Sequence, residues 1–289
     1  MNYYKIINKN KCHHKLRHKV GLNIDPLPFN PSGSCEAGGI YFASENILHF
    51  LKDDSKYIVK ITIPDDAKVY KDPGSLEKWK ADRLIFGEFC TIDLLKIKEL
   101  LSEGANLADS VGKWVCANSN KQAVEFLWYE GVNFDEVHLS IAIENNRRDI
   151  VDFLLEQNVT ISYTCNTVLK YAALYNYEDI IKLCCNSEFF DANSEEAASA
   201  LASVTTVDMM NFLLSKKIKM NASVMHVASC RGRCDIIKLF FDLGYKLCYR
   251  SDFDGLSYVA IVNGYKEASE LFVKYKDSCV GYENSIRVF

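Results

Sequence analysis

Three residues of the kind that bind zinc lie close together near the C-terminal end of the sequence. His226, Cys230 and Cys234 follow one another at intervals of four within the segment 225–244. If one helix covered the segment, this spacing would place all three side chains on one face. A structural zinc ion takes four nitrogen or sulfur ligands. Whether these three side chains can bind one metal ion therefore depends on which helices carry them.

A further candidate for chemistry is Cys35, in the glycine-rich stretch GSCEAGG at 33–39. A thiol becomes a nucleophile when a neighbouring base activates it. No motif fixes a histidine partner for Cys35. The sequence also has no phosphate-binding glycine loop followed by lysine, no nucleophile elbow and no His-Glu-x-x-His. We therefore assign no catalytic residue from motifs alone.

Composition and charge restrict the class of protein. The chain has 289 residues, of which 48% are hydrophobic and 25% charged. Such a composition is typical of globular proteins, and the length allows two domains. The apolar runs are too short to span a bilayer and the first residues lack a signal peptide, so we expect an intracellular protein with reduced cysteines. Residues 1–20 hold six basic and no acidic side chains, which predicts a solvated N-terminal arm. The net charge of −4 argues against a nucleic-acid partner.

An internal repeat organises the C-terminal two-thirds of the chain. The segment GRCDIIKLFFDLG at 232–244 resembles six others, and the last positions of the seven copies are 27 to 32 residues apart, at 104, 131, 158, 188, 217, 244 and 276. Each copy has apolar residues spaced along one helix face. Five copies begin with a carboxylate that favours a helix start, at Asp149, Asp179, Asp208, Asp235 and Glu267.

A second helical segment precedes four of these copies and carries a small residue at a fixed position. Ala142, Ala172, Ala228 and Ala260 each fall four residues before Asn146, Asn176, Gly232 and Gly264. Asn and Gly tolerate the left-handed conformation that ends a helix. The predicted unit is a helix, a tight turn, a second helix and a connector.

This unit resembles the ankyrin repeat. Met225, His226, Ala228, Gly232 and Leu239 match the family pattern, and the likeness covers about residues 91–276. The period is shorter than the family's, so the hairpin fingers should be short or absent. In this register His226 lies on the first helix, Cys230 on its last turn and Cys234 on the second helix. The pattern offers no fourth ligand, and we predict no metal site.

The first 90 residues contain no repeat and form a predicted small α+β domain. YIVKITIP alternates like a strand, and further strands are expected in GGIYF, DDAKVYKDPG and RLIFGEF, with a short helix after GGIYF. Three blocks in order, GLNIDPLPFNPSGSCEAGGIYF, ITIPDDAKVYKDP and KWKADRLIFGE, resemble the N-terminal domain of ankyrin repeat proteins from giant DNA viruses of the mimivirus type. That resemblance implies a viral protein in the host cytoplasm.

A second resemblance of this domain is to ADP-ribosyltransferases. It implies that His14 binds the ribose of NAD, that Tyr41 stacks on nicotinamide, and that Glu88 or Asp82 is the acidic partner. A carboxylate there would stabilise the oxocarbenium-like transition state of the transfer. An inactive relative of this fold and a recruitment domain without chemistry are the alternatives.

We therefore predict an α+β N-terminal domain (1–90), an all-α ankyrin-type helical solenoid of six to seven repeats (91–276) and a C-terminal tail (277–289). The expected function is a scaffold that binds another protein, supplied by the host, without a cofactor and without a membrane. The alternative is an active or degenerate NAD-dependent ADP-ribosyltransferase in the N-terminal domain, to which the repeats would bring the target protein. Contacts to the partner are expected from exposed first-helix positions: Lys113, Ser140, Lys170, Ser199, His226 and Tyr258.

Overall fold

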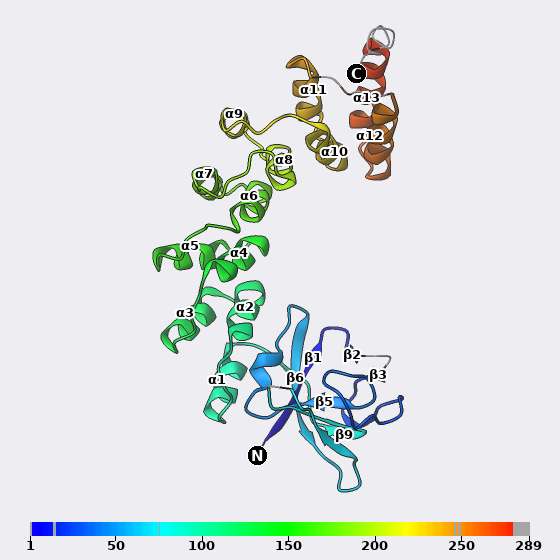
Figure 1. Cartoon of the computed structure of the whole chain (residues 1–289), viewed down its shortest axis with the longest axis vertical. Helices are drawn as coiled ribbons and strands as arrows, with labels where there is room; N and C mark the ends of the chain where they lie inside the picture. Colours follow the sequence, from blue (N-terminus) through cyan, green and yellow to red (C-terminus); the bar gives the residue numbers. More distant parts are fainter. Residues whose placement is uncertain (1, 14–15, 75, 246, 248–249, 280–289) are drawn as a thin grey trace. The chain divides into compact units, whose positions relative to one another are not determined.

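A computed structural model of the chain describes residues 2–13, 16–74, 76–245, 247 and 250–279. They belong to two compact units, Met1–Val159 and Thr160–Phe289. The first unit holds all of the described strands and the helices α1 to α5, and the second holds α6 to α13 (Figure 1). Among the described residues, no helix combines the length and the apolar character that a bilayer span requires.

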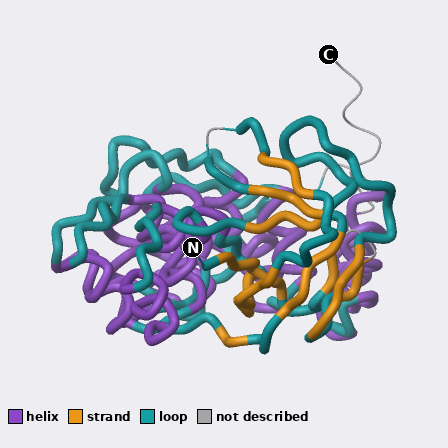
Figure 2. Tube along the Cα trace, turned by 90° about the horizontal axis from the view of Figure 1, so that it is seen from below, coloured by secondary structure: helices purple, strands orange, loops and turns teal. Residues whose placement is uncertain are grey.

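The strands of the first unit are antiparallel and form two main sheets, which Figure 2 shows in orange. The larger sheet has the order β1-β6-β9-β4, with β10 also paired to β6; its strands are β1 (Tyr3–Asn8), β6 (Ser55–Thr62), β9 (Arg83–Phe86), β4 (Gly21–Ile24) and β10 (Cys90–Thr91). The smaller sheet has the order β5-β8-β7, with β5 (Ile40–Phe42), β8 (Trp79–Ala81) and β7 (Val69–Lys71). The strands β2 (Cys12–His13) and β3 (Leu16–Arg17) pair antiparallel as a separate two-stranded sheet.

One apolar core joins the two sheets. Its buried members come from β1, β5, β6, β8 and β9: Ile7, Ile40, Phe42, Val59, Ile61, Ala81, Leu84 and Phe86. Burial of these β-branched and aromatic side chains is what stabilises such short strands. The strands predicted in YIVKITIP, GGIYF, DDAKVYKDPG and RLIFGEF are confirmed as β6, β5, β7 and β9.

One prediction for this region was wrong. The expected solvated N-terminal arm contains β1, which pairs with β6 from Tyr3 to Asn8 and buries Tyr4 and Ile7. Burial of the apolar side chains of YYKII stabilises this segment as a strand of the sheet, although basic residues surround it in the sequence. The short helix expected after GGIYF is present as a 3₁₀ helix, η1 (Ile47–Phe50).

In both units the helices follow the predicted order of helix, tight turn, second helix and connector. In the first unit they are α1 (Leu94–Ser102), α2 (Asp109–Asn118), α3 (Lys121–Tyr129), α4 (Glu136–Glu144) and α5 (Arg148–Glu156). In the second they are α6 (Cys165–Leu174), α7 (Glu178–Cys185), α8 (Glu195–Leu201), α9 (Val207–Ser215), α10 (Ala222–Cys230), α11 (Cys234–Asp242), α12 (Arg250–Val262) and α13 (Lys266–Cys279). Apart from α1, they form six pairs.

The turns inside the pairs have the predicted backbone. Asn146, Asn176, Gly232 and Gly264 have φ values of 56°, 59°, 65° and 86°. The aligned last positions of the copies behave in the same way at Gly104, Gly131, Asn158, Lys217 and Gly244, all with positive φ. The copies ending at 188 and 276 differ, because position 188 lies in the loop after α7 and Lys276 lies inside α13.

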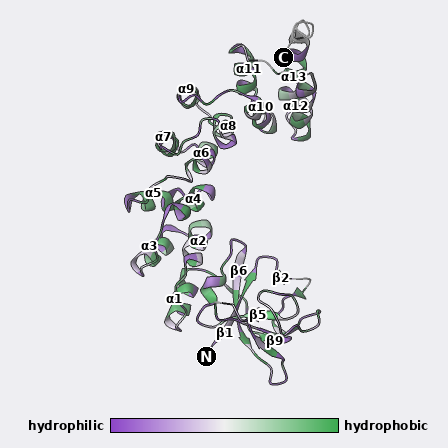
Figure 3. Cartoon of the chain, in the orientation of Figure 1, coloured by the Kyte–Doolittle hydropathy of each residue, from purple (hydrophilic) through white to green (hydrophobic). Residues whose placement is uncertain are grey.

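Small side chains lie where helices meet. Ala142, Ala172, Ala228 and Ala260 are all 0% exposed. Within the first unit α2 packs on α4 and α3 on α5, and within the second α6, α8, α10 and α12 pack in succession. First helices therefore contact first helices, as the alanine pattern predicts. Figure 3 shows hydrophobic and hydrophilic residues sharing each helix, as expected of helices buried on one side.

Candidate functional site

Four of the predicted partner-binding residues have accessible side chains on first helices. Tyr258 on α12 is 68% exposed, and His226 on α10 is exposed. Lys113 on α2 pairs with Asp109 at 2.6 Å, and its side chain is 40% exposed. Lys170 on α6 is half-buried, with its ammonium 5.2 Å from the ring centre of Tyr171.

The prediction of exposure was wrong for the two serines of the set. Ser140 on α4 is 5% exposed and Ser199 on α8 is 7% exposed. The Ser140 hydroxyl donates to Glu144 on the next turn of its own helix at 3.1 Å. A serine side chain is too short to reach past the neighbouring helix, whereas the chains of lysine and tyrosine extend beyond it.

The possible zinc ligands are divided between two helices, as the repeat register predicts. His226 and Cys230 lie on α10, with 3.8 Å between Nδ1 and Sγ, while Cys234 is the first residue of α11. Gly232, with a φ of 65°, separates them by a tight turn. Within the described part of the chain, no cluster of three or more histidine, cysteine or acidic side chains could hold a metal ion.

A cavity lies in the strand-rich part of the first unit. It encloses about 380 Å³ beside β1 and β5, and it brings together residues that are far apart in the sequence, from Lys5 to Lys78. Its lining includes basic side chains (Lys5, His13, His18, Lys52 and Lys78), the thiols of Cys12 and Cys35, and an apolar and aromatic wall that contains Ile7, Tyr41, Phe42, Ile47 and Phe50.

Lys5 is the most deeply buried cation of this cavity. It is 8% exposed, and its ammonium donates to the carbonyl oxygen of Tyr41 at 2.9 Å. No carboxylate forms an ion pair with it among the residues that the structure describes. Burial lowers the pKa of Lys5 to about 8, and the charge of Asp25 opposes that shift only in part.

A second lysine activates the thiol at the rim of the cavity. The ammonium of Lys78 lies 2.8 Å from Sγ of Cys35. This hydrogen bond is the main cause that lowers the pKa of the thiol. Asp72, whose side chain is fully buried, holds the arrangement: it accepts from the Cys35 amide at 3.2 Å and lies 3.7 Å from the Lys78 ammonium. Cys35 itself adopts a φ of 60°. This value lies in the left-handed region, which is strained for a residue with a side chain.

His18 lines the cavity without a hydrogen-bond partner among the described residues. It is 5% exposed, and both of its ring nitrogens are unpartnered there. Burial lowers the pKa of His18 to about 3, with a further contribution from the charge of Lys5. The ring is therefore neutral at physiological pH. It offers one N–H donor and one acceptor.

The residues of the ADP-ribosyltransferase alternative are only partly brought together. Tyr41 lines the cavity, and its hydroxyl donates to the carbonyl of Glu36 at 3.1 Å. Glu88 and Asp82 are not part of the lining; Asp82 instead accepts from the Lys68 amide and from Arg83. His14 lies outside the described residues.

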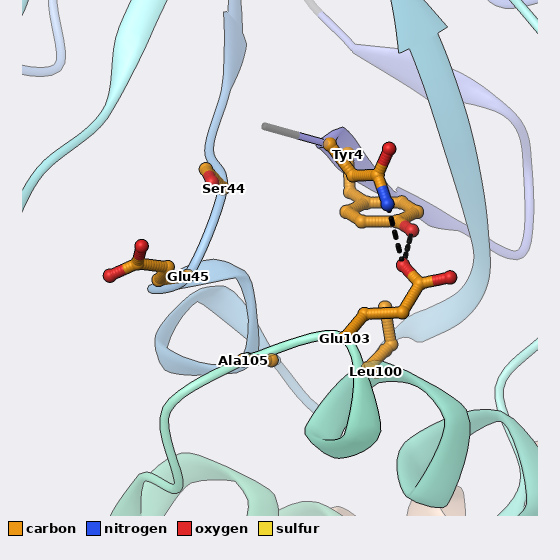
Figure 4. Close-up of a pocket in the computed structure, with 7 residues that line it drawn as sticks. Tyr4, Ser44, Glu45, Leu100, Glu103 and Ala105 are labelled. Carbon is orange, nitrogen blue, oxygen red and sulfur yellow. Dashed lines mark hydrogen bonds between the residues drawn. The ribbon is translucent and has the colours of Figure 1, made fainter.

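A smaller site marks the junction between the strands and the first helix. Figure 4 shows Glu103, which follows α1, reaching Tyr4 of β1, whose hydroxyl donates to it. The amide of Asn2 donates to the same carboxylate oxygen at 3.1 Å. The bond from Tyr4 is the main cause that lowers the pKa of Glu103, and burial together with this carboxylate raises the pKa of Tyr4. These contacts anchor the first helix to the larger sheet.

The sequence indicated Cys35 and Tyr41 but offers no reason to choose Lys5 or Lys78. The predicted basic arm includes Lys5, although its apolar neighbours in YYKII are the signal that it lies in a strand. Lys78 and Cys35 are 43 residues apart, so only the pairing of β5 with β8 brings their neighbourhoods together.

Comparison with known proteins agrees with the geometry of the helix pairs. Residues 113–196 match the family described as ankyrin repeats in three copies. Three proteins of Acanthamoeba polyphaga mimivirus are similar to the chain. "Putative ankyrin repeat protein R868" is 28% identical over 162 residues, which is 53% of this chain and 81% of that protein.

The other two relatives are matched over smaller shares of their length. "Putative ankyrin repeat protein R229" is 40% identical over 96 residues, 30% of this chain and 31% of that protein. "Putative ankyrin repeat protein R896" is 32% identical over 138 residues, 45% of this chain and 41% of that protein. The chain thus contains ankyrin repeats and is homologous to ankyrin repeat proteins of mimivirus.

Proposed function

We propose that the chain is a scaffold that binds another protein through its ankyrin repeats. The observation that carries this proposal is the match of residues 113–196 to ankyrin repeats, which are generally protein-interaction modules, on helix pairs with the expected turns. Stacked helix pairs bury a continuous core and leave an extended face available, and we propose that the pairs form such a solenoid.

The proposed recognition surface consists of long side chains on first helices. Tyr258 and Lys170 are the central candidates, because aromatic and cationic side chains supply much of the energy at protein interfaces. His226 on α10 belongs to the same unit as these two residues, and Lys113 on α2 is the candidate of the first unit. Ser140 and Ser199 take no part in it, since both are buried.

The proposed partner is a protein of the host cell, met in the host cytoplasm. The support for this step is the source of the relatives, all three of which come from mimivirus. No cofactor is part of the proposal. The transferase alternative is set aside because neither Glu88 nor Asp82 lines the cavity that contains Tyr41.

The test is capture of partners from an Acanthamoeba lysate by the full-length chain and by two double variants. Lys170→Ala with Tyr258→Ala removes two side chains from first helices. Lys182→Ala with Tyr129→Ala is the matched control, because these residues lie on the second helices α7 and α3 and are exposed. Thermal melting first establishes that each variant is folded.

We expect the first double variant to capture its specific partner at least about tenfold less, the effect of losing about 1.4 kcal/mol of binding free energy. The control should capture as much as the unmodified chain. Equal capture by the first variant and loss of capture by the control would place recognition on the second helices and overturn the proposal.

A further inference from the structure

The cavity beside β1 and β5 has more ammonium groups than carboxylates in its described lining. Lys5, Lys52 and Lys78 are its lysines, and Asp54 is its single acidic lining residue among those described, while the ring of His18 is neutral. The carboxylate of Asp72, which is not part of the lining, lies 3.7 Å from the Lys78 ammonium and offsets its charge. In the described part of the chain, no carboxylate comes as close to the Lys5 ammonium.

Burial of Lys5 without a carboxylate is costly. A buried ammonium is normally paired, because its desolvation otherwise outweighs the hydrogen bonds that it makes. The carbonyl of Tyr41 accepts from the ammonium at 2.9 Å. This neutral group satisfies only one of the three donors. An anion in the adjoining cavity would complete the coordination of this ammonium and recover part of that cost.

His18 provides a second and independent reason to expect a ligand. Buried polar atoms in native proteins are almost always hydrogen-bonded. Both ring nitrogens of His18 lack a partner among the described residues although the side chain is 5% exposed, and the ring lines the same cavity as Lys5. A ligand oxygen could accept from its N–H group.

The remaining wall of the cavity sets the character of the ligand beyond its charge. Tyr41 and Phe50 contribute aromatic rings, and Ile7, Phe42 and Ile47 contribute apolar surface. The cavity volume is about 380 Å³. Such a volume is in the range of sites for small organic molecules and exceeds what an inorganic ion requires.

We propose that this cavity is a binding site for a small organic anion, with its phosphate or carboxylate group at Lys5, His18 and Lys78 and an aromatic or apolar body against Tyr41 and Phe50. Cys35 lies at the edge of this site, where its sulfur contacts Lys78. A bound anion would cover the thiol and would compete with it for the Lys78 ammonium.

The experiment is calorimetric titration of the full-length chain with phenyl phosphate and with benzoate. Phenol and inorganic phosphate are titrated as probes of the ring alone and of the charged group alone. We expect saturable binding of at least one aromatic anion, and weaker binding of phenol and inorganic phosphate. The comparison of phenyl phosphate with benzoate identifies the charged group that the site prefers.

Variants locate the binding. Lys5→Met and Lys78→Met should each weaken the affinity for the preferred anion at least about tenfold. Lys71→Met is the matched control: Lys71 is an exposed lysine of β7 outside the cavity, and its loss should leave the affinity unchanged. Melting curves establish that each variant is folded.

Alkylation of Cys35 gives a measurement that needs no variant. Iodoacetamide should modify this thiol in the unmodified chain, and the preferred anion should slow its modification at saturation while leaving that of exposed Cys90 unchanged; peptide mass spectrometry reads both. Two results would overturn the proposal: no saturable binding of either aromatic anion, or binding that neither protects Cys35 nor depends on Lys5 and Lys78.

Discussion

The guanidinium of Arg147 donates two hydrogen bonds, of 3.2 and 3.0 Å, to the carbonyl oxygen of Ala117, which lies 30 residues earlier in the chain. Ala117 belongs to the last turn of α2, where carbonyl groups have no partner within the helix. Arg147 follows the turn residue Asn146. One repeat therefore caps the first helix of the repeat before it.

The same link recurs in the second unit. Arg233, which follows the turn residue Gly232, donates to the carbonyl oxygen of Ala202 at the end of α8 at 3.1 Å. The two arginines occupy the same position in the repeat register. A hydrogen bond between neighbouring repeats thus occurs at the same repeat position at these two turns. The periodic pattern of apolar residues does not predict it.

Arg147→Met should lower the free energy of unfolding by about 1–3 kcal/mol, because it leaves a carbonyl group at a helix end without its charged donor. Arg148→Met is the control. The neighbouring Arg148 forms a pair with Asp152 on the helix surface. Such a surface pair is worth about 0–1 kcal/mol. Chemical denaturation of both variants measures the difference. Equal losses would mean that the bond to Ala117 adds nothing beyond a surface ion pair.

Ala228→Leu should lower the free energy of unfolding by about 1–3 kcal/mol, because Ala228 is fully buried on α10 and the added carbons have no room. Ala222 is the exposed first residue of the same helix. Ala222→Leu should therefore change the free energy of unfolding by only about 0.5 kcal/mol or less. Thermal melting monitored by circular dichroism compares the two. An unchanged melting curve for Ala228→Leu would contradict the repeat register.

Gly232→Ala should destabilise the fold, since Gly232 has a φ of 65°. That conformation costs a residue with a Cβ atom about 1–2 kcal/mol. The new Cβ would also clash with the Tyr265 ring, which would have to move. Gly255→Ala in α12 meets no atom within 4 Å. This second change should stabilise its helix by about 0.5–1 kcal/mol. Opposite shifts in the urea midpoint of unfolding are the expected result; an unchanged or raised midpoint for Gly232→Ala would show that the backbone at Gly232 is not constrained.

Lys5→Met should raise the free energy of unfolding at neutral pH by about 1–3 kcal/mol, because it removes a buried and unpaired charge. The pKa of Lys5 is lowered from 10.5 to about 8 in the folded chain. Below that folded value the lysine is protonated in both the folded and the unfolded chain, so its cost is constant. Between the two values the unfolded chain binds more protons, and the cost disappears as the pH rises.

The advantage of the Lys5→Met variant should therefore be full below pH 8 and should vanish towards pH 10.5. Lys56 lies on the exposed side of β6 and supplies the control. Lys56→Met should change the free energy of unfolding by about 0.5 kcal/mol or less. Urea denaturation across this pH range is the measurement. A destabilised Lys5→Met variant, or an advantage that grows with pH, would show that the Lys5 charge is well accommodated in the fold.

The repeats were predictable because their determinants are local. The apolar spacing of one helix, the alanine at its contact with the next helix and an Asn or Gly at the turn all lie within one repeat unit, and each predicts the same unit. Hence Asn146, Asn176, Gly232 and Gly264 could be assigned to turns from the sequence alone, and their positive φ values confirm it.

The tertiary structure alone decided the exposure of individual first-helix residues. Ser140 and Tyr258 occupy the same register position, but the former is 5% and the latter 68% exposed. The length of a side chain and the helix packed beside it determine that difference, and neither follows from the repeat pattern.

The cavity beside β1 and β5 depended on the tertiary structure even more. Lys5, Cys35 and Lys78 lie on segments that only the pairing of strands brings together, and a single sequence carries no signal for contacts of such separation. The sequence by itself determined the repeat and the reactive residue types. The tertiary structure decided which of those residues share one site, because burial and strand pairing act over distances that sequence periodicity does not reach.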